Sequence, residues 1–404
     1  MAEPMGLNGD DIVFGLATEE QRRIAVALRG EAWAPPMSLA DYMERETLLS
    51  EQELTSNSQG QLWVVYLKGY PRQVIASCET TRKPVLISAG DGSPARDAFA
   101  FSITDVYTNP LYRRQGMAAF LLRHVQEEMD KDGEFSVLYS NSGRNYYHSL
   151  GWPTFTSRQA NLTFLPAPRT PTSPTAGAGQ NSEPSSPASY SSSSSFFGAS
   201  DFMPSQPELT LPLQLSNLPK LCELDEMYFR ACFASLEQTP DNKMHVAFLP
   251  NRAQIEWQLA RSELDAEKLM GKTNPIKGAI TTNGRAWITW AHDWREKRLR
   301  VLRISLALEG ASSEWQRVED VRVLLEAALA EAREWGFRKV VVWNPDSEVT
   351  HGCKSVGNRH PSDVKIVFDE RIDGSLPSLR WQGARLDKPR KRIEWEENQG
   401  FCLC

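Results

Sequence analysis

Six consecutive residues have the types needed to bind an anion through the main chain. They read Arg113-Arg114-Gln115-Gly116-Met117-Ala118, and the apolar residues after them recur at helical spacing. Gly116 and Ala118 leave little side-chain bulk at the start of this predicted helix, so its free N–H groups and its dipole can approach an anion closely. The pattern therefore predicts a diphosphate-binding turn that uses no lysine.

Strands must lie on both sides of this turn and helix to hold them. The residues from Phe99 to Ile103 alternate between apolar and small or polar types, and Val106 falls out of phase, which predicts a β-bulge. Asn109-Pro110 marks the turn, and Glu134 to Ser140 has the composition of a second strand. The predicted order is strand, loop, helix, strand.

This arrangement resembles motif A of the GCN5-related N-acetyltransferase (GNAT) family. Arg113, Gly116 and Ala118 fill the three fixed positions of that motif, and the run from Asn145 to Trp152 is similar to the family's motif B. The resemblance implies an α/β (α+β) fold with a central mixed, mostly antiparallel sheet. It also implies acetyl-CoA as co-substrate and transfer of its acetyl group to an amine.

The resemblance assigns coenzyme A contacts to the bulge, the turn, the helix start and motif B. These cofactor-binding candidates are Val106, Thr108, Arg113, Arg114, Gln115, Gly116, Met117, Ala118 and Asn145. Pantetheine amides are expected to pair with the open edge of the bulged strand, and an N–H at the bulge to polarise the thioester carbonyl.

The reaction implied by the resemblance also needs a proton donor and a base. Tyr147 stands where the family's tyrosine often lies near the thioester sulfur, and a phenol donates to a thiolate while staying protonated at neutral pH. The alternative is that Tyr147 is only an aromatic residue of the hydrophobic core. Ser102 occupies the family's acidic base position, so Glu79 and Asp105 are the candidate bases instead. Surface carboxylates and a water relay stay open as alternatives.

The length and composition of the chain limit the classes of protein to which it can belong. A chain of 404 residues favours two domains, and a net charge of -6 gives no general attraction to nucleic acid or to acidic membranes. Six scattered cysteines form neither a disulfide framework nor a metal-ligand pattern, so we expect no metal. No apolar run approaches the roughly 18 residues that span a bilayer. These features predict a cytoplasmic protein.

The chain divides into three predicted parts. Residues 1–165 form the acetyltransferase domain, 166–206 a disordered Ser/Pro-rich linker, and 207–404 a second α/β domain. The last part repeats the order strand, strand, helix, strand and is a candidate degenerate GNAT-like half; an unrelated α/β module is the alternative. Its counterpart of the turn, Leu308–Ser313, lacks motif A, and Glu309 would repel a diphosphate. We expect this half to supply substrate contacts or a homodimer surface.

Other residues carry weaker hypotheses. We interpret His124 as a partly exposed surface histidine. His292 and Asp293 are a candidate orienting pair, although neighbouring residues on a strand point to opposite faces. We interpret the basic run Lys388–Arg392 as a solvent-exposed surface, and a nuclear localisation signal is the alternative. Ser-Pro pairs in the linker are slight support for phosphorylation or docking there.

The whole layout is similar to fungal enzymes that acetylate the ε-amine of free lysine in lysine catabolism. The likeness rests on Trp33, Tyr42 and Arg45, on the run Ala76–Thr80, and on a Trp-rich second half. It implies that acetyl-CoA and L-lysine give N6-acetyl-L-lysine and coenzyme A. Two alternatives stay open: a protein lysine or N-terminal acetyltransferase, and a non-catalytic coenzyme A-binding or interaction protein.

Overall fold

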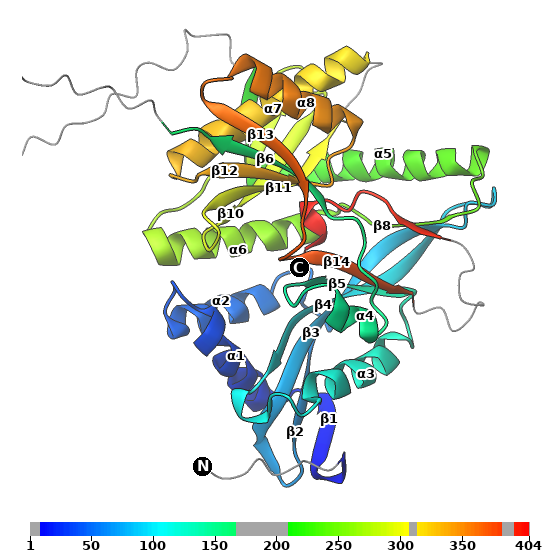
Figure 1. Ribbon diagram of the computed structural model, residues 1–404, viewed down its shortest axis with the longest axis vertical. Coiled ribbons are helices and arrows are strands. Elements are labelled where there is room, and N and C mark those ends of the chain that lie inside the picture. Colours follow the sequence, from blue (N-terminus) through cyan, green and yellow to red (C-terminus); the bar gives the residue numbers. More distant parts are fainter. Residues whose placement is uncertain (1–8, 167–208, 307–312, 382–391, 404) are drawn as a thin grey trace, which may run out of the picture.

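The computed structural model describes residues 9–166, 209–306, 313–381 and 392–403. Two mixed β-sheets, each flanked by helices, lie one above the other (Figure 1). The predicted linker lies almost wholly outside the described residues, as do Leu308 to Ser312 and Lys388 to Lys391. None of the helices in these described ranges is long and apolar enough to cross a bilayer.

The first sheet has eight strands, in the order β1-β2-β3-β4-β5-β14, with β8 paired to β3 and β15 paired to β8. Helix α3 covers one face, while α1 and α2 cover the other. The strands are β1 (Ile12–Leu16), β2 (Gly60–Leu67), β3 (Tyr70–Ser88), β4 (Arg96–Thr108), β5 (Phe135–Ser140), β8 (Met244–Phe248), β14 (Leu376–Trp381) and β15 (Ile393–Trp395). The helices of this part are α1 (Glu19–Trp33), α2 (Leu39–Ser50), α3 (Met117–Met129) and α4 (Asn145–Ser149), with short 3-10 turns at Gly9–Asp11 and Pro110–Tyr112.

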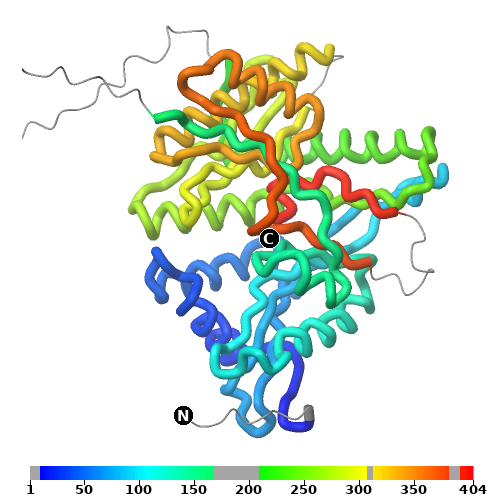
Figure 2. The backbone as a smooth tube through the Cα atoms, viewed as in Figure 1, coloured from blue at the N-terminus to red at the C-terminus, as the bar shows by residue number. Residues whose placement is uncertain are grey.

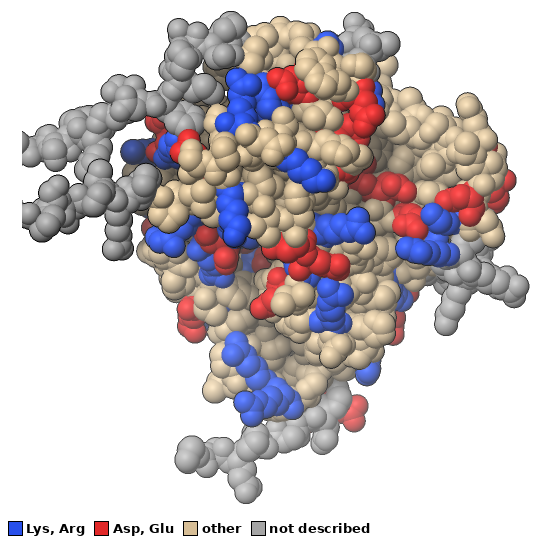
Figure 3. Space-filling model, turned by 45° about the horizontal axis from the view of Figure 1, so that its top comes forward, with Lys and Arg blue, Asp and Glu red and all other residues tan. Residues whose placement is uncertain are grey.

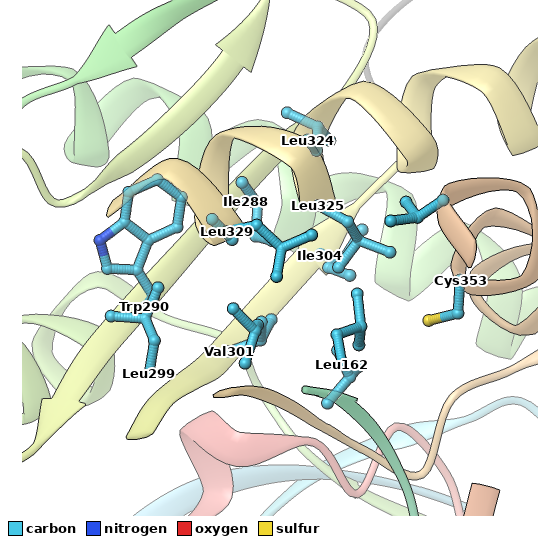
Figure 4. Close-up of a cluster of buried hydrophobic side chains, with 14 of the residues drawn as sticks. Leu162, Ile288, Trp290, Leu299, Val301, Ile304, Leu324, Leu325, Leu329 and Cys353 are labelled. Carbon is cyan, nitrogen blue, oxygen red and sulfur yellow. The ribbon is translucent and has the colours of Figure 1, made fainter. Parts of the chain in front are cut away.

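The second sheet has seven strands, in the order β13-β6-β12-β11-β10-β9-β7. They are β6 (Arg158–Phe164), β7 (Thr210–Leu213), β9 (Gly278–Thr281), β10 (Trp287–Asp293), β11 (Arg298–Ser305), β12 (Lys339–Trp343) and β13 (Val364–Glu370). The helices here are α5 (Leu218–Gln238), α6 (Arg252–Met270), α7 (Glu314–Glu334) and α8 (Ser347–Arg359), with 3-10 turns at Leu215–Asn217 and Gly400–Cys402. Figure 4 shows the core where α7 and α8 pack on this sheet, around residues such as Ile288, Val301 and Leu325.

The two sheets repeat one topology and exchange strands. In the first sheet β3 and β4 are antiparallel, α3 follows, and β5 is parallel to β4; in the second, β10, β11, α7 and β12 have the same relations. Strand β6 leaves the first half and pairs with β12, whereas β14 leaves the second half and pairs with β5 (Figure 1). Each sheet is therefore built from both sides of the predicted boundary at residue 165.

A shared core and the end of the chain join the two parts. Phe135 of β5, Trp287 of β10 and Phe401 near the C-terminus belong to one buried cluster. The C-terminal turn lies where the two halves meet (Figure 2), and its carbonyls accept hydrogen bonds from Gln254 of α6 and Lys83 of β3. The tail therefore contacts both halves at once.

The first elements agree with the expectations from sequence, with one correction. The sequence predicts helices that begin after Thr18 and Ser38, and these residues cap α1 and α2. It also predicts two strands, at Gln73–Glu79 and Pro84–Ser88, but these are a single strand, β3. The polar residues between them looked like a break, but Thr80 accepts a hydrogen bond from the indole of Trp63 and remains buried within the strand.

Candidate active site

The bulge predicted from the slip in apolar phase lies in β4. Strand β3 shifts register between Ser77 and Glu79, so that Cys78 faces two residues of β4, Asp105 and Val106. Asp105 adopts a positive φ of 55°, a conformation that few residues other than glycine take. The extra residue bends the strand here and turns its backbone groups out of the regular ladder.

The two central strands of the first sheet separate next to this bulge. Strand β4 pairs with β5 in parallel as far as Ile103 opposite Leu138. Val106 and Thr108 follow on the separated part of β4, where the strand edge facing β5 is open to an extended ligand. The location of both residues fits the cofactor contacts that the resemblance assigns to them.

The anion-binding turn has the local geometry that its residue types predict. Gly116 is the N-cap of α3 in the left-handed region, with φ of 78°, and Arg114 also has a positive φ. The first helical hydrogen bond runs from the amide of Phe120 to the carbonyl of Gly116 over 2.9 Å. The amides of Met117 and Ala118 precede that bond and point out of the helix start, where an anion binds best.

The side chains around this turn differ in their exposure. Arg113 is exposed, and its Nε donates to the carbonyl of Thr108 over 3.1 Å, which ties the turn to the end of β4. The buried side-chain oxygen of Gln115 has no hydrogen-bond partner among the described residues. Met117 is buried in the core under α3. The six residues therefore divide into a packed helix start and an exposed basic rim.

Tyr147 packs against the same apolar cluster as Cys78 and Val106 of the bulge. Its ring packs against the core under α3, and burial raises the pKa of its phenol, with Tyr146 and Cys78 adding to the rise. Asn145, at the start of α4, is exposed.

The two candidate bases, Glu79 and Asp105, both contact an arginine that the sequence analysis did not identify as a site residue. Arg29 of α1 is fully buried, and its guanidinium lies 2.7 Å from Glu79 and 3.5 Å from Asp105. It also pairs with Glu46 of α2 at 2.8 Å and donates to the hydroxyl of Tyr42 over 3.2 Å. Oxygens of the three carboxylates lie within 4.8 Å of one another. Such a group has the spacing of a metal site, but here the guanidinium supplies the positive charge.

Burial and the oppositely charged partner shift the pKa of each of these groups in opposite directions. Burial alone would lower the pKa of Arg29, but the carboxylates of Asp105, Glu79 and Glu46 outweigh it and hold that pKa well above its ordinary value. Burial also raises the pKa of Asp105, and Glu46 and Glu79 raise it further against the opposing effect of Arg29. Asp105 therefore has the stronger character of a base among the described carboxylates of this cluster.

A pocket opens beside this cluster between the first half and α6. It is small, with a volume of about 40 Å³, and it is partly open to solvent. Its lining comes from α2 and the turn after it, from β3 and β4, and from α6: Glu46, Leu49, Ser50, Thr55, Glu79, Thr81, Thr104, Asp105, Trp257 and Arg261. Both candidate bases face it. A larger hollow between α8 and β13 contains none of the predicted site residues.

The structure also places the histidines to which the sequence analysis gave weaker hypotheses. The His292-Asp293 pair does not form, because the two side chains point to opposite faces of β10: His292 contacts Glu331 at 3.0 Å, and Asp293 contacts Arg298 at 2.9 Å. His124 is partly buried beside Phe120 and contacts its carbonyl.

The pocket residues missed from the sequence come from distant parts of the chain. Arg29 follows the apolar residues Ala25 and Val26 on the buried face of α1, and that placement of a charge was the one local signal available. Trp257 and Arg261 lie on a helix of the second half, more than 150 residues from the bulge. No spacing rule connects them to the site.

Two family models match the chain. One, described as the LYC1 GNAT-like C-terminal domain, matches residues 195–404, and the other, an acetyltransferase (GNAT) domain, matches residues 96–155. The second range contains the bulge, the anion-binding turn and Tyr147. Because the first model spans more than half of the chain, the protein belongs to the LYC1-like family of GNAT acetyltransferases. This family uses acetyl-CoA as its co-substrate.

Individual relatives are distant. A protein of Yarrowia lipolytica named lysine acetyltransferase is 22% identical over 343 residues, which cover 79% of this chain and 81% of that protein. The uncharacterized protein YGR111W of Saccharomyces cerevisiae is 21% identical over 437 residues and covers 98% of both chains. Among solved structures, a conserved protein of Enterococcus faecalis, described as a probable N-acyltransferase, matches 92% of this chain and 72% of its own, with a TM-score of 0.50 and 10% identity. That likeness agrees with the GNAT fold.

Proposed function

We propose that this protein transfers the acetyl group of acetyl-CoA to the ε-amine of free L-lysine, giving N6-acetyl-L-lysine and coenzyme A. One observation carries the proposal: the two candidate bases at the bulge of β4, Glu79 and Asp105, line a single pocket between α2 and α6. A negatively charged pocket beside a thioester-binding strand is suited to an amine. The distant Yarrowia lipolytica relative supports lysine as the acceptor by its name.

The residues divide the chemistry between them. Amides at Met117 and Ala118 hold the diphosphate, the open edge at Val106 and Thr108 holds the pantetheine arm, and Asn145 and the arginines of the turn border it. Bound acetyl-CoA supplies the acetyl group as a reactive thioester, so the enzyme needs only to position the amine and to move protons.

Two protons change place in the transfer. Asp105 accepts a proton from the attacking ammonium, assisted by Glu79, because its raised pKa makes it a stronger base than an ordinary carboxylate. The amine nitrogen then bonds to the carbonyl carbon, and the carbon–sulfur bond breaks. Tyr147 donates its proton to the departing thiolate, and the second proton that the nitrogen loses restores the Tyr147 phenol. Its raised pKa keeps the phenol protonated throughout the neutral range.

The pocket favours a small acceptor over a protein. Its walls come from α2 on one side and α6 on the other, and the indole of Trp257 in α6 donates to the carbonyl of Leu49 in α2 over 3.1 Å. This contact closes the pocket along one side, whereas a protein acetyltransferase needs a long trough for its substrate chain.

An acceptor screen tests the proposal. Thiol release from acetyl-CoA is followed with L-lysine, other amino acids, polyamines and basic peptides, and we expect L-lysine to give the highest kcat/KM. Tyr147→Phe should lower kcat by about 100-fold or more while acetyl-CoA binding is retained. Tyr146→Phe, its exposed neighbour, is the matched control and should leave the rate unchanged. Absence of thiol release with every amine, or full activity of Tyr147→Phe, would contradict the proposed function.

A further inference from the structure

One face of α6 is fixed against α2 across the pocket. Trp257, Arg261 and Asp265 are spaced four residues apart, so they lie on the same face of the helix. The indole of Trp257 donates to the carbonyl of Leu49, and Asp265 pairs with Arg45 at 2.8 Å. Arg261 lies between these two contacts, one turn from each. Its backbone is therefore held at the edge of the pocket.

The wall opposite Arg261 is negative. Glu46, Glu79 and Asp105 line the pocket together, with oxygens within 4.8 Å of one another. Arg29 contacts all three carboxylates and Arg45 pairs with Glu46 at 2.7 Å, which compensates much of this charge, but the carboxylate oxygens remain hydrogen-bond acceptors. This wall is suited to an ammonium group.

Arg261 itself is an available cation. Its side chain is exposed, and within the described ranges no hydrogen bond or ion pair joins it to another residue; its guanidinium lies 5.9 Å from the centre of the Trp257 ring. Burial lowers the pKa of Arg300 to about 10, and both Arg298 and Arg261 contribute to that decrease. Figure 3 shows basic and acidic side chains interspersed over one face of the molecule.

We propose that Arg261 binds the carboxylate of a free amino-acid acceptor and so directs the side-chain amine toward Asp105 and Glu79. The inference rests on the proposed function and deepens it, because it names the acceptor class: an α-amino acid that carries an amine at the end of its side chain. A guanidinium binds a carboxylate through two parallel hydrogen bonds, which fixes the orientation of the ligand. The second half of the molecule then contributes specificity through α6.

Other amines fit this pocket less well. A diamine without a carboxylate brings a second ammonium against Arg261, and like charges at that distance repel. A lysine within a peptide has its carboxyl group in an amide bond, which cannot make the charged pair. The arrangement therefore discriminates by the carboxylate as well as by the amine.

The test compares L-lysine with cadaverine, the same carbon chain and amines without the carboxylate. Steady-state kinetics and calorimetry of acceptor binding, with coenzyme A present, are measured for wild type, Arg261→Gln and Arg261→Lys. Arg252→Gln is the matched control, since Arg252 is an exposed arginine on the same helix that pairs with Glu53 outside the pocket. Every variant is first shown to unfold like the wild type.

We expect Arg261→Gln to raise KM and Kd for L-lysine about 10- to 100-fold, the usual loss for a charged hydrogen-bond partner, with kcat kept. Arg261→Lys should restore part of the affinity, and kinetics with cadaverine should not worsen. Unchanged binding of L-lysine by Arg261→Gln, equal losses for both amines, or no binding of L-lysine by wild type would overturn the role of Arg261. The proposed function fails by a different result, the lack of thiol release from wild type with either amine, and calorimetry still decides the inference in that case.

Discussion

Arg29 organises the candidate active site at the scale of single residues. It is a buried cation that contacts Glu46, Glu79 and Asp105, and none of these carboxylates could lie so close to the others without it. Removing one partner of a buried ion pair is costly because the remaining charge stays in a poorly solvated place. The chemistry of the site therefore depends on a residue that has no direct part in the reaction.

Replacement of Asp105 by Asn tests the proposed base. We expect kcat to fall about 100-fold or more, because the amide cannot accept the proton of the ammonium. In the wild type, activity should decrease as the pH falls through the raised pKa of Asp105, above the ordinary range of an aspartate. A pH–rate profile checks both. Asp293→Asn, a carboxylate paired with Arg298 away from the pocket, should keep the wild-type profile.

The same substitution has a consequence for stability. Because the pKa of Asp105 is raised in the folded state, the folded protein binds a proton before the unfolded chain does as the pH falls. The ionised group therefore opposes folding at neutral pH, and the free energy of unfolding decreases as the pH rises through the folded-state pKa. Arg29 keeps Glu46 and Glu79 as partners in Asp105→Asn, so this variant should be at least as stable as wild type at neutral pH. A variant that is both active and less stable would contradict this account of the base.

At the scale of elements, Gly116 at the start of α3 must both adopt a left-handed backbone conformation and leave room for an anion. Gly116 has φ of 78°, and a Cβ built on it would have no atom within 4 Å. Gly116→Ala therefore meets no steric clash, but a left-handed backbone costs an alanine about 1–2 kcal/mol. We expect a decrease of that size in the free energy of unfolding and, because the turn shifts, a KM for acetyl-CoA about 10-fold higher.

A second glycine separates these two effects. Gly336 follows α7 with φ of 68° and an equally open position for a Cβ, but it lies in the second half. Gly336→Ala should lose similar stability without any change in the KM for acetyl-CoA. Chemical denaturation and initial rates measure the pair. An equal rise of KM in both variants would mean that the turn has no special part in binding the co-substrate.

The elements also show what a sequence can predict. The turn at Arg113–Ala118, the cap at Thr18 and the bulge in β4 depend on residues close together in the chain, so local spacing predicted all three. The pocket joins α2 with α6, and such contacts depend on tertiary packing that no local pattern records. The same holds for the pairing of β14 with β5, which lie more than 200 residues apart.

At the scale of the whole molecule, the exchange of β6 and β14 makes each half depend on the other. Leu162 of β6 is buried in the core of the second sheet, and Leu379 of β14 is buried in the core that both halves share. A fragment that ends after β6 exposes that strand, while the complementary fragment lacks the strand that joins β13 to β12. The apolar surface left open would favour aggregation over folding.

We therefore predict that fragments 1–166 and 209–404 do not fold when expressed separately but form a soluble complex when expressed together. Circular dichroism and co-purification measure folding and assembly, and the complex should unfold in one cooperative transition because the two sheets share a core. Shortening the first fragment to 1–157 removes β6 and should abolish the complex, although every residue of the candidate active site in that half is kept. A fragment that unfolds cooperatively on its own would mean that the exchanged strands are dispensable, and that the pocket between α2 and α6 joins two independent domains.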